Sequence, residues 1–215
     1  MLRECGEHGY YRGENCPICG EPGKFLMSEQ ELEQLGRTLA GVLRHFPERF
    51  GLDMDEQGFV NLRDFISAMR DNNRRYHWLR PHHVVAIIET DPKGRYQISN
   101  DLMRATYGHS LELDLKLPTD NIPDFLYYPA TSEETDIILE TGLHPSDRKM
   151  VHLSRTYQDA FNAGRVRVEV PVILEIDATA AIEAGNVISL AGKTVFLTYE
   201  IPPEFLSKKE EEEIL

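Results

Sequence analysis

The sequence lacks any long hydrophobic run. No apolar stretch of its 215 residues approaches the roughly 20 residues that span a bilayer. The N-terminus also lacks the charged-then-apolar order of a secretory signal. We therefore expect a cytoplasmic protein with no membrane partner. Because 41% of its residues are hydrophobic, the chain can still build the core of one large or two small domains.

Cysteine is scarce, and all three cysteines lie between residues 5 and 19. An odd number in so short a segment suits a metal site in a reducing compartment better than a disulfide framework. With one histidine they form the pattern C-x2-H-x7-C-x2-C, made of Cys5, His8, Cys16 and Cys19. Two closely spaced pairs can surround one ion tetrahedrally, so we predict a structural zinc site. An unliganded, disordered segment is the alternative.

Several catalytic and nucleotide-binding motifs are missing. The chain has no G-x-G-x-x-G or G-x-x-x-x-G-K-[ST], which gives no support to a Rossmann fingerprint or a P-loop. No serine, cysteine or threonine stands in a recognisable nucleophile motif.

Positive charge is in deficit overall but not everywhere. The net charge of −13 argues at first against nucleic-acid binding, because phosphate contacts need local positive potential. Residues 34–104 nevertheless carry 11 Lys and Arg against 9 Asp and Glu, whereas residues 105–215 carry 9 against 20. Arginine, which grips phosphate bidentately, dominates the first of these segments. The sequence therefore allows a basic pocket within an acidic protein.

The segment after the cysteines predicts three helices and a hairpin. Ser28 and Glu31 form a capping box for a helix that ends before Pro47. Asn61 can cap a second helix, Pro81 suits the first turn of a third, and "RYQIS" predicts a strand. This order is the outline of a winged helix. Residues 105–207 alternate short strands and helices, so the overall class is α+β.

Basic residues recur where predicted elements end. Arg44 and His45 close the first helix, where the helix dipole alone would favour cations. Arg95 begins a strand, and Arg148 precedes another. Such groups suit a reaction in which a phosphate is positioned and negative charge is stabilised.

Several motifs in one order carry a resemblance to a known family. They are "LGRTLAGVLRHFPERFGLDMDEQGFVNLRDFI", "GRYQIS", "RATYGHS", "GLHPSDRKMVHLS" and "VPVILEIDATAAIEAGN…VFLTYEIPPEFL". Over roughly residues 34–206 the chain resembles the NAD-dependent RNA 2'-phosphotransferases, the tRNA splicing family also called KptA. The resemblance implies a winged-helix lobe and an ADP-ribosyltransferase-like lobe with the active site in the cleft between them.

The resemblance also implies a reaction and its partners. An internal RNA 2'-phosphate attacks NAD and expels nicotinamide. The resulting RNA–phospho-ADP-ribose then yields an RNA 2'-hydroxyl and ADP-ribose 1'',2''-cyclic phosphate. The partners are NAD and an RNA with a 2'-phosphate, such as tRNA, and we expect a monomer. The corresponding regions are a zinc-binding segment 1–26, a winged-helix RNA-binding lobe 27–104, an NAD-binding lobe 105–207 and an acidic tail 208–215.

Functional residues follow from the matching motifs. The family's catalytic positions fall on Arg44, His45, Arg95 and Arg148. The positions implied for NAD binding are Arg104, Gly108, His109, Ser110, Thr131, His152, Leu153 and Ser154. The chain departs from the family at two places. It reads "LYYPAT" where His-Gly-Thr usually follows Leu-Tyr, and Tyr107 stands where glutamine is usual.

Two other interpretations remain open at this stage. One is a non-enzymatic nucleic-acid-binding protein with a zinc knuckle, a winged helix and a degenerate NAD lobe. The other keeps the enzyme but makes a terminal nucleic-acid phosphate the group that receives ADP-ribose. The four catalytic positions, all of them basic in this chain, favour the 2'-phosphotransferase.

Overall fold

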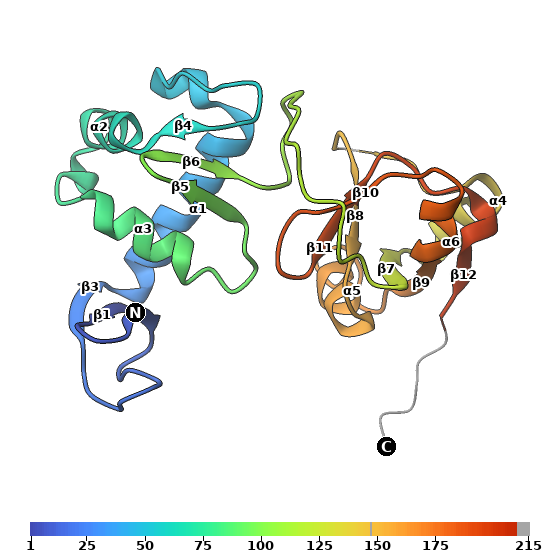
Figure 1. Ribbon diagram of the computed structural model, residues 1–215, viewed down its shortest axis with the longest axis horizontal. Coiled ribbons are helices and arrows are strands. Elements are labelled where there is room, and N and C mark those ends of the chain that lie inside the picture. The colour runs from blue at the N-terminus through green and yellow to red at the C-terminus, as the bar shows by residue number, and fades with distance from the viewer. Residues whose placement is uncertain (147, 210–215) are drawn as a thin grey trace. The chain divides into compact units, whose positions relative to one another are not determined.

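The computed structural model describes residues 1–146 and 148–209, so most of the predicted acidic tail lies outside the described residues. The chain divides into two compact units, Met1–Lys116 and Leu117–Leu215 (Figure 1). Among the described helices, none combines the length and apolar character that a membrane crossing requires. The two units are described separately below.

The first unit begins with a small antiparallel ribbon. Its strands are β1 (Leu2–Cys5), β2 (Gly9–Arg12) and β3 (Lys24–Met27), in the order β2-β1-β3. Leu2 and Met27 are fully buried and belong to the core of the unit. Because these apolar ends anchor it, the ribbon is part of the first unit rather than a separate appendage. Sequence patterns predicted the metal ligands in this segment but not its strands.

The three predicted helices of this unit are confirmed. They are α1 (Glu29–His45), α2 (Leu62–Asn72) and α3 (Pro81–Glu89). The predicted capping box of Ser28 and Glu31 opens α1, and the Asn61 side chain caps α2. The short 3-10 helices η1 (Pro47–Phe50) and η2 (Arg74–Tyr76) were not predicted. Proline at position 47 ends α1, which leaves Arg44 and His45 in its last turn.

A small sheet completes the first unit. Its strands are β4 (Val60–Asn61), β5 (Tyr96–Ser99) and β6 (Leu102–Ala105), in the antiparallel order β4-β6-β5. Met103 at its centre is fully buried, as are Leu39 of α1 and Phe65 of α2. These side chains belong to one continuous core, so sheet and helices form a single packed body.

The second unit is built on one antiparallel sheet. Its order is β10-β11-β8-β7-β9-β12. The strands are β7 (Phe125–Ala130), β8 (Val151–Ser154), β9 (Val172–Asp177), β10 (Ile188–Leu190), β11 (Val195–Thr198) and β12 (Leu206–Lys208). The sequence predicted short strands in this region; β10 and β12 carry too few residues for a clear pattern of their own.

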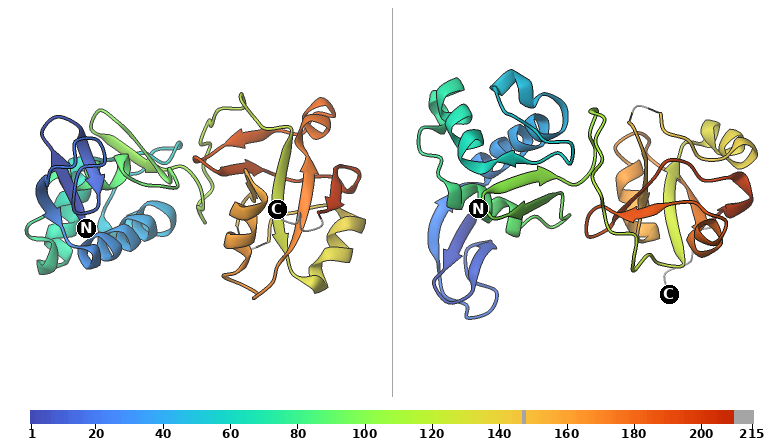
Figure 2. Two further views of the ribbon diagram at one scale, coloured as in Figure 1. Left: turned by 90° about the horizontal axis from the view of Figure 1, so that it is seen from below. Right: turned by 45° about the horizontal axis from the view of Figure 1, so that its top comes forward.

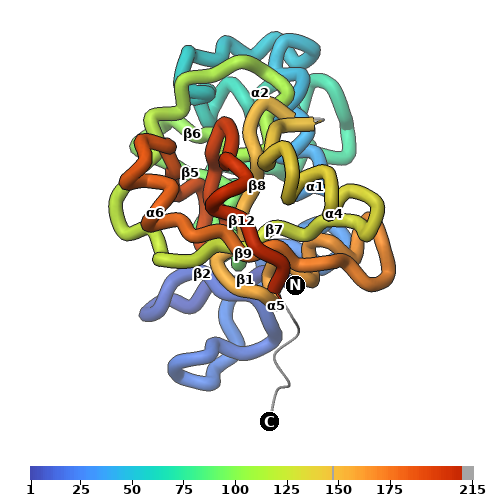
Figure 3. The backbone as a smooth tube through the Cα atoms, turned by 90° about the vertical axis from the view of Figure 1, so that its right-hand side faces the viewer, coloured from blue at the N-terminus to red at the C-terminus, as the bar shows by residue number. Residues whose placement is uncertain are grey.

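Three helices and a short 3-10 helix flank this sheet. They are α4 (Ser132–Thr141), α5 (Tyr157–Gly164), α6 (Ala178–Glu183) and η3 (Pro203–Phe205). Figure 2 shows α5 on one side of β7 and β9, with α4 and α6 on the other. Figure 3 looks directly at the second unit and shows α4 and α6 at its two flanks. Each face of the central strands is therefore covered.

The boundary between the units lies later than the sequence suggested. Sequence motifs placed it after Arg104, whereas residues 105–116 belong to the first unit. Their backbone explains this, because the N–H of Ser110 donates to the carbonyl of Arg44 and that of Asp114 to the carbonyl of Glu56. The "GHS" motif therefore belongs to the first unit and not to the unit that holds the later strands.

Candidate active site

The end of α1 and the "GHS" motif lie together in the first unit. The guanidinium carbon of Arg44 lies 5.0 Å from the centre of the Tyr107 ring. His45 Nδ1 and Ser110 Oγ are 3.0 Å apart, within hydrogen-bonding distance, and the N–H of Ser110 donates to the carbonyl of Arg44 at 3.1 Å. A cation that only stabilises the C-terminal end of a helix does not require contacts with Tyr107 or Ser110. The motif therefore holds the Arg44–His45 pair in place.

Gly108 permits this close approach. Its φ of 83° is in the left-handed region, and a Cβ built there would lie 3.3 Å from the guanidinium carbon of Arg44. Both facts favour glycine, because other residues are strained at this φ and a side chain would displace the guanidinium. Nε and Nη2 of Arg44 are shielded from solvent in this arrangement.

Arg95 is held by a buried carboxylate. Asp91 is 1% exposed, and its oxygens accept hydrogen bonds from Arg95 Nη2 at 2.7 Å and Nε at 3.1 Å. The Arg95 backbone N–H also donates to Asp91, at 2.6 Å. Burial would raise the pKa of Asp91, but these hydrogen bonds outweigh it and hold the pKa below its usual range. The carboxylate therefore stays ionised and fixes the guanidinium.

Two buried tyrosines link Arg44 to Arg95. Tyr96 and Tyr107 are 6% and 8% exposed. Burial raises the pKa of both phenols, while Arg44 and Arg95 each oppose that rise, so both cations act on both rings. The tyrosines therefore remain neutral at physiological pH. The Arg44 guanidinium lies 5.0 Å from the centre of the Tyr107 ring and that of Arg95 lies 5.5 Å from the centre of the Tyr96 ring, so each cation is next to a buried, neutral aromatic side chain.

Arg104 and His109, both implied in NAD binding, are buried side chains. Arg104 donates to the Gln97 side chain and to the carbonyls of Gln57 and Leu115, at 2.7 to 2.9 Å. Its guanidinium also lies 4.4 Å from the centre of the Phe59 ring. Through these contacts, Arg104 connects the β5–β6 hairpin with the segment that follows it, at Leu115.

The second unit holds the remaining predicted residues. Thr131 caps α4, its hydroxyl accepting from the N–H of Glu134 while its own N–H donates to that carboxylate. Glu134 also binds Arg167 at 2.5 Å. Arg148 is exposed in the segment before β8. Thr131 therefore has a structural role as the cap of α4, in addition to its predicted contact with NAD.

The "HLS" residues occupy β8. This strand pairs with β11 along its whole length but with β7 only between Ser154 and Tyr127. Leu153 is 1% exposed and packs in the core of the unit, so only its backbone can face a ligand. His152 Nδ1 lies 3.0 Å from the carbonyl of Met150. The strand β8 is therefore paired more extensively with β11 than with β7.

The four predicted metal ligands form one cluster. The ligand atoms of Cys5, His8, Cys16 and Cys19 all lie within 4.8 Å of one another. The Sγ of Cys5 is 3.4 Å from His8 Nδ1 and 3.8 Å from Cys19 Sγ. A tetrahedral zinc ion requires ligand separations of about 3.5 to 3.8 Å, given its usual bond lengths. Hydrogen bonding to the Cys19 backbone lowers the pKa of Cys16 to about 6, which favours the thiolate that metals bind. The cluster could hold a metal ion.

Sequence reasoning missed the residues that position the arginines. Asp91 was not singled out, although its spacing of four residues from Arg95 across the "DPKGR" turn was a usable signal. Tyr107 was noted only as a departure from the family, and its place beneath Arg44 came from the structure. Arg12 on β2, whose Nε donates to Thr90 Oγ1 at 3.1 Å, carried no sequence signal.

Fold and side chains together define a class: an α+β protein of two units, the first of which holds arginines packed against buried aromatic rings. Residues 30–200 match the model of the family described as RNA 2'-phosphotransferase, Tpt1 / KptA family. The chain belongs to this family. A protein of Thermoplasma acidophilum named "Probable RNA 2'-phosphotransferase" is 44% identical over 99% of this chain and 90% of the relative. One of Methanosarcina barkeri with the same name is 45% identical over 98% of this chain and 100% of the relative.

The close approach of Gly108 to Arg44 leads to a prediction. Gly108→Ala should lower the free energy of unfolding of the first unit by about 1–2 kcal/mol, because alanine is strained at a left-handed φ. Urea unfolding can be followed by the fluorescence of Trp78, the single tryptophan of the chain. The matched control is Gly36→Ala in α1, where a Cβ meets nothing within 4 Å. It should raise stability by about 0.5–1 kcal/mol. Equal effects of the two substitutions would contradict the account.

Proposed function

We propose that this protein transfers an internal RNA 2'-phosphate to NAD. The products are nicotinamide, RNA with a free 2'-hydroxyl and ADP-ribose 1'',2''-cyclic phosphate, formed through an RNA–phospho-ADP-ribose intermediate. The observation that carries the proposal is the packing of Arg44 against buried Tyr107 and of Arg95 against buried Tyr96, with His45 beside Ser110, in a member of the RNA 2'-phosphotransferase family.

Arg44, His45 and Arg95 would bind the 2'-phosphate. A phosphate dianion is best held by planar guanidinium groups that donate two parallel hydrogen bonds. Asp91 and Tyr107 fix the two guanidiniums in advance, so little side-chain entropy is lost on binding. His45, exposed at the end of α1, adds a third donor whose orientation Ser110 sets.

Arg148 would act in the second step of the reaction. When a neighbouring ribose hydroxyl attacks the bridging phosphate, negative charge grows on the phosphate oxygens. An exposed arginine before β8 is suited to stabilise that charge, because exposure leaves its guanidinium accessible to substrate. It is not needed for the first attack in this scheme, so its loss should separate the two steps.

Each unit contains residues proposed for NAD binding. Gly108, His109 and Ser110 belong to the first unit, while Thr131 and the β8 residues His152, Leu153 and Ser154 belong to the second. The short pairing of β8 with β7, at Ser154 and Tyr127 only, supports this assignment, because it leaves the other β8 residues without a paired partner on β7. Arg104 would support the site through the hairpin rather than touch NAD directly.

The units would correspond to the two lobes implied by the resemblance. We assign the first unit as the winged-helix, RNA-binding lobe, since it has three helices and a β5–β6 hairpin. We assign the second as the ADP-ribosyltransferase-like lobe. The natural RNA would be one with a 2'-phosphate at a splice junction, such as tRNA, and the protein would act as a monomer.

An oligonucleotide assay tests the function. The protein is incubated with NAD and an RNA oligonucleotide that carries one internal 2'-phosphate. We expect nicotinamide release, loss of the 2'-phosphate and formation of ADP-ribose cyclic phosphate in equal amounts. Absence of all three products would refute the proposal. ADP-ribose transferred only to an oligonucleotide with a terminal phosphate would favour the alternative acceptor, and RNA binding without NAD binding would favour the non-enzymatic protein.

A matched pair of variants serves as the internal control of that assay. Arg148→Ala should accumulate the RNA–phospho-ADP-ribose conjugate, because the second step is slowed more than the first. Lys149→Ala removes the same charge from the next exposed residue and should leave the product ratio unchanged. If Arg148→Ala lowered the rate without a change in product ratio, the role assigned to Arg148 would be wrong.

We also propose that the Cys/His cluster holds a structural zinc ion. Four protein ligands leave no open position for catalysis, and the observed separations match a tetrahedral site. Metal analysis should find one zinc per chain. His8→Ala should lose the metal and lower the melting temperature of the first unit, since zinc binding stabilises small ribbons. His77→Ala, an exposed histidine of the same unit, is the control and should keep the metal. Full stability of His8→Ala without metal would contradict the proposal.

A further inference from the structure

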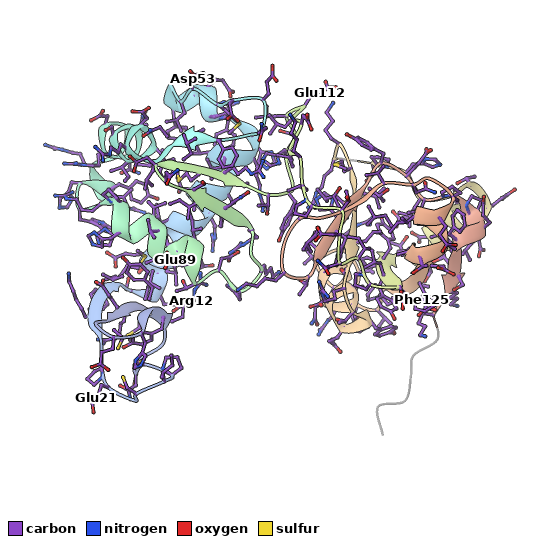
Figure 4. The ribbon with its side chains drawn as sticks, in the orientation of Figure 1. Arg12, Glu21, Asp53, Glu89, Glu112 and Phe125 are labelled. Atoms are coloured by element: carbon purple, nitrogen blue, oxygen red, sulfur yellow. The ribbon has the colours of Figure 1, made fainter. Side chains whose placement is uncertain are left out.

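Arg12 lies where the metal-binding ribbon meets α3. It is the last residue of β2 and pairs with the fully buried Leu2, which fixes its backbone. Figure 4 shows it beside Glu89, at the opposite end of the ribbon from Glu21. Its Nε donates to Thr90 Oγ1 at 3.1 Å, one residue before Asp91. The ribbon therefore brings a guanidinium to the edge of the Asp91–Arg95 pair.

Positive charge outweighs negative charge around Tyr96. Four charged side chains act on Tyr96: Arg95, Arg44, Asp91 and Arg12. Three of these are cations and one is an anion. Two further carboxylates lie near Arg12: Glu89, which Figure 4 shows beside it, and Glu29, which pairs with the N-terminal ammonium group. The local positive charge attracts anions.

The proposed substrate has a second anion at the right position. A nucleotide with an internal 2'-phosphate also carries a phosphodiester on its adjacent 3'-oxygen. When Arg44 and Arg95 bind the 2'-phosphate, the adjacent phosphodiester is therefore brought close to any cationic side chain next to Arg95. Arg12 lies at the edge of the Asp91–Arg95 pair, because its Nε donates to Oγ1 of Thr90, the residue before Asp91, and its side chain is exposed to solvent.

We propose that Arg12 is a further RNA-binding residue, which contacts a backbone phosphodiester next to the 2'-phosphate. The proposal rests on the proposed function for the identity of the RNA. Arg12 lies outside residues 30–200, which match the family model, so the ribbon adds this contact to the family's common part. The contact recognises any RNA backbone and does not select for the 2'-phosphate.

Binding measurements with two oligonucleotides test this role. The two RNAs differ only in one internal 2'-phosphate, and affinity is measured at several salt concentrations. Arg12→Gln should weaken binding of both RNAs equally, by about fivefold at low salt, and reduce the salt slope by about 0.7. Arg12→Lys should keep most of the slope, because it keeps the charge. The control Lys24→Gln removes a charge from exposed β3 of the same ribbon and should change neither.

Each other outcome has a defined meaning. If Arg12→Gln and Lys24→Gln behaved alike, the proposal would be overturned. It would also be overturned if Arg12→Gln lowered the unfolding temperature with an intact salt slope, since Arg12 would then only close α3. Loss of the preference for the 2'-phosphorylated RNA would place Arg12 on that phosphate instead. If the wild-type protein showed no such preference, the proposed function would fail, while the unmodified RNA would still test Arg12.

Discussion

The ion pair between the buried Asp91 and the partly exposed Arg95 is the interaction on which the proposed site depends. A carboxylate taken fully out of water is stable only when its charge is matched and its oxygens are hydrogen-bonded. Three donors from Arg95 meet this need, two from the side chain and one from the backbone. The pair therefore closes the turn between α3 and β5 and at the same time presents a guanidinium at a fixed place. The same ion pair thus stabilises the turn and positions the Arg95 guanidinium for the proposed phosphate binding.

The rest of the first unit brings further groups to that point. The β5–β6 hairpin returns the chain so that Tyr107 and Gly108 lie against Arg44 at the end of α1. From the other side, β2 of the ribbon carries Arg12 to Thr90. Segments far apart in the sequence thus meet around one anion site. The acidic composition of the chain does not prevent this, because the local charge and not the net charge governs binding at short range.

Much of this was predictable from the sequence, and the limits have physical causes. The caps at Ser28 and Asn61 and the stop at Pro47 are local, so the helices they bound were predicted closely. The metal ligands were found because their spacing is a local pattern too. Asp91 was missed because the sequence offered only its four-residue spacing from Arg95, and its burial became apparent in the fold. The boundary of the units was placed too early, because the contacts of residues 105–116 with α1 are long-range.

A double-mutant cycle tests most directly whether Asp91 acts through Arg95. Affinity for the 2'-phosphorylated oligonucleotide is measured for Asp91→Asn, Arg95→Lys and the double variant, with folding checked by Trp78 fluorescence. If Asp91 serves to hold Arg95, the two losses overlap, and a coupling energy of about 1–3 kcal/mol is predicted. Losses that add within about 0.5 kcal/mol would contradict the account, because the two residues would then act independently.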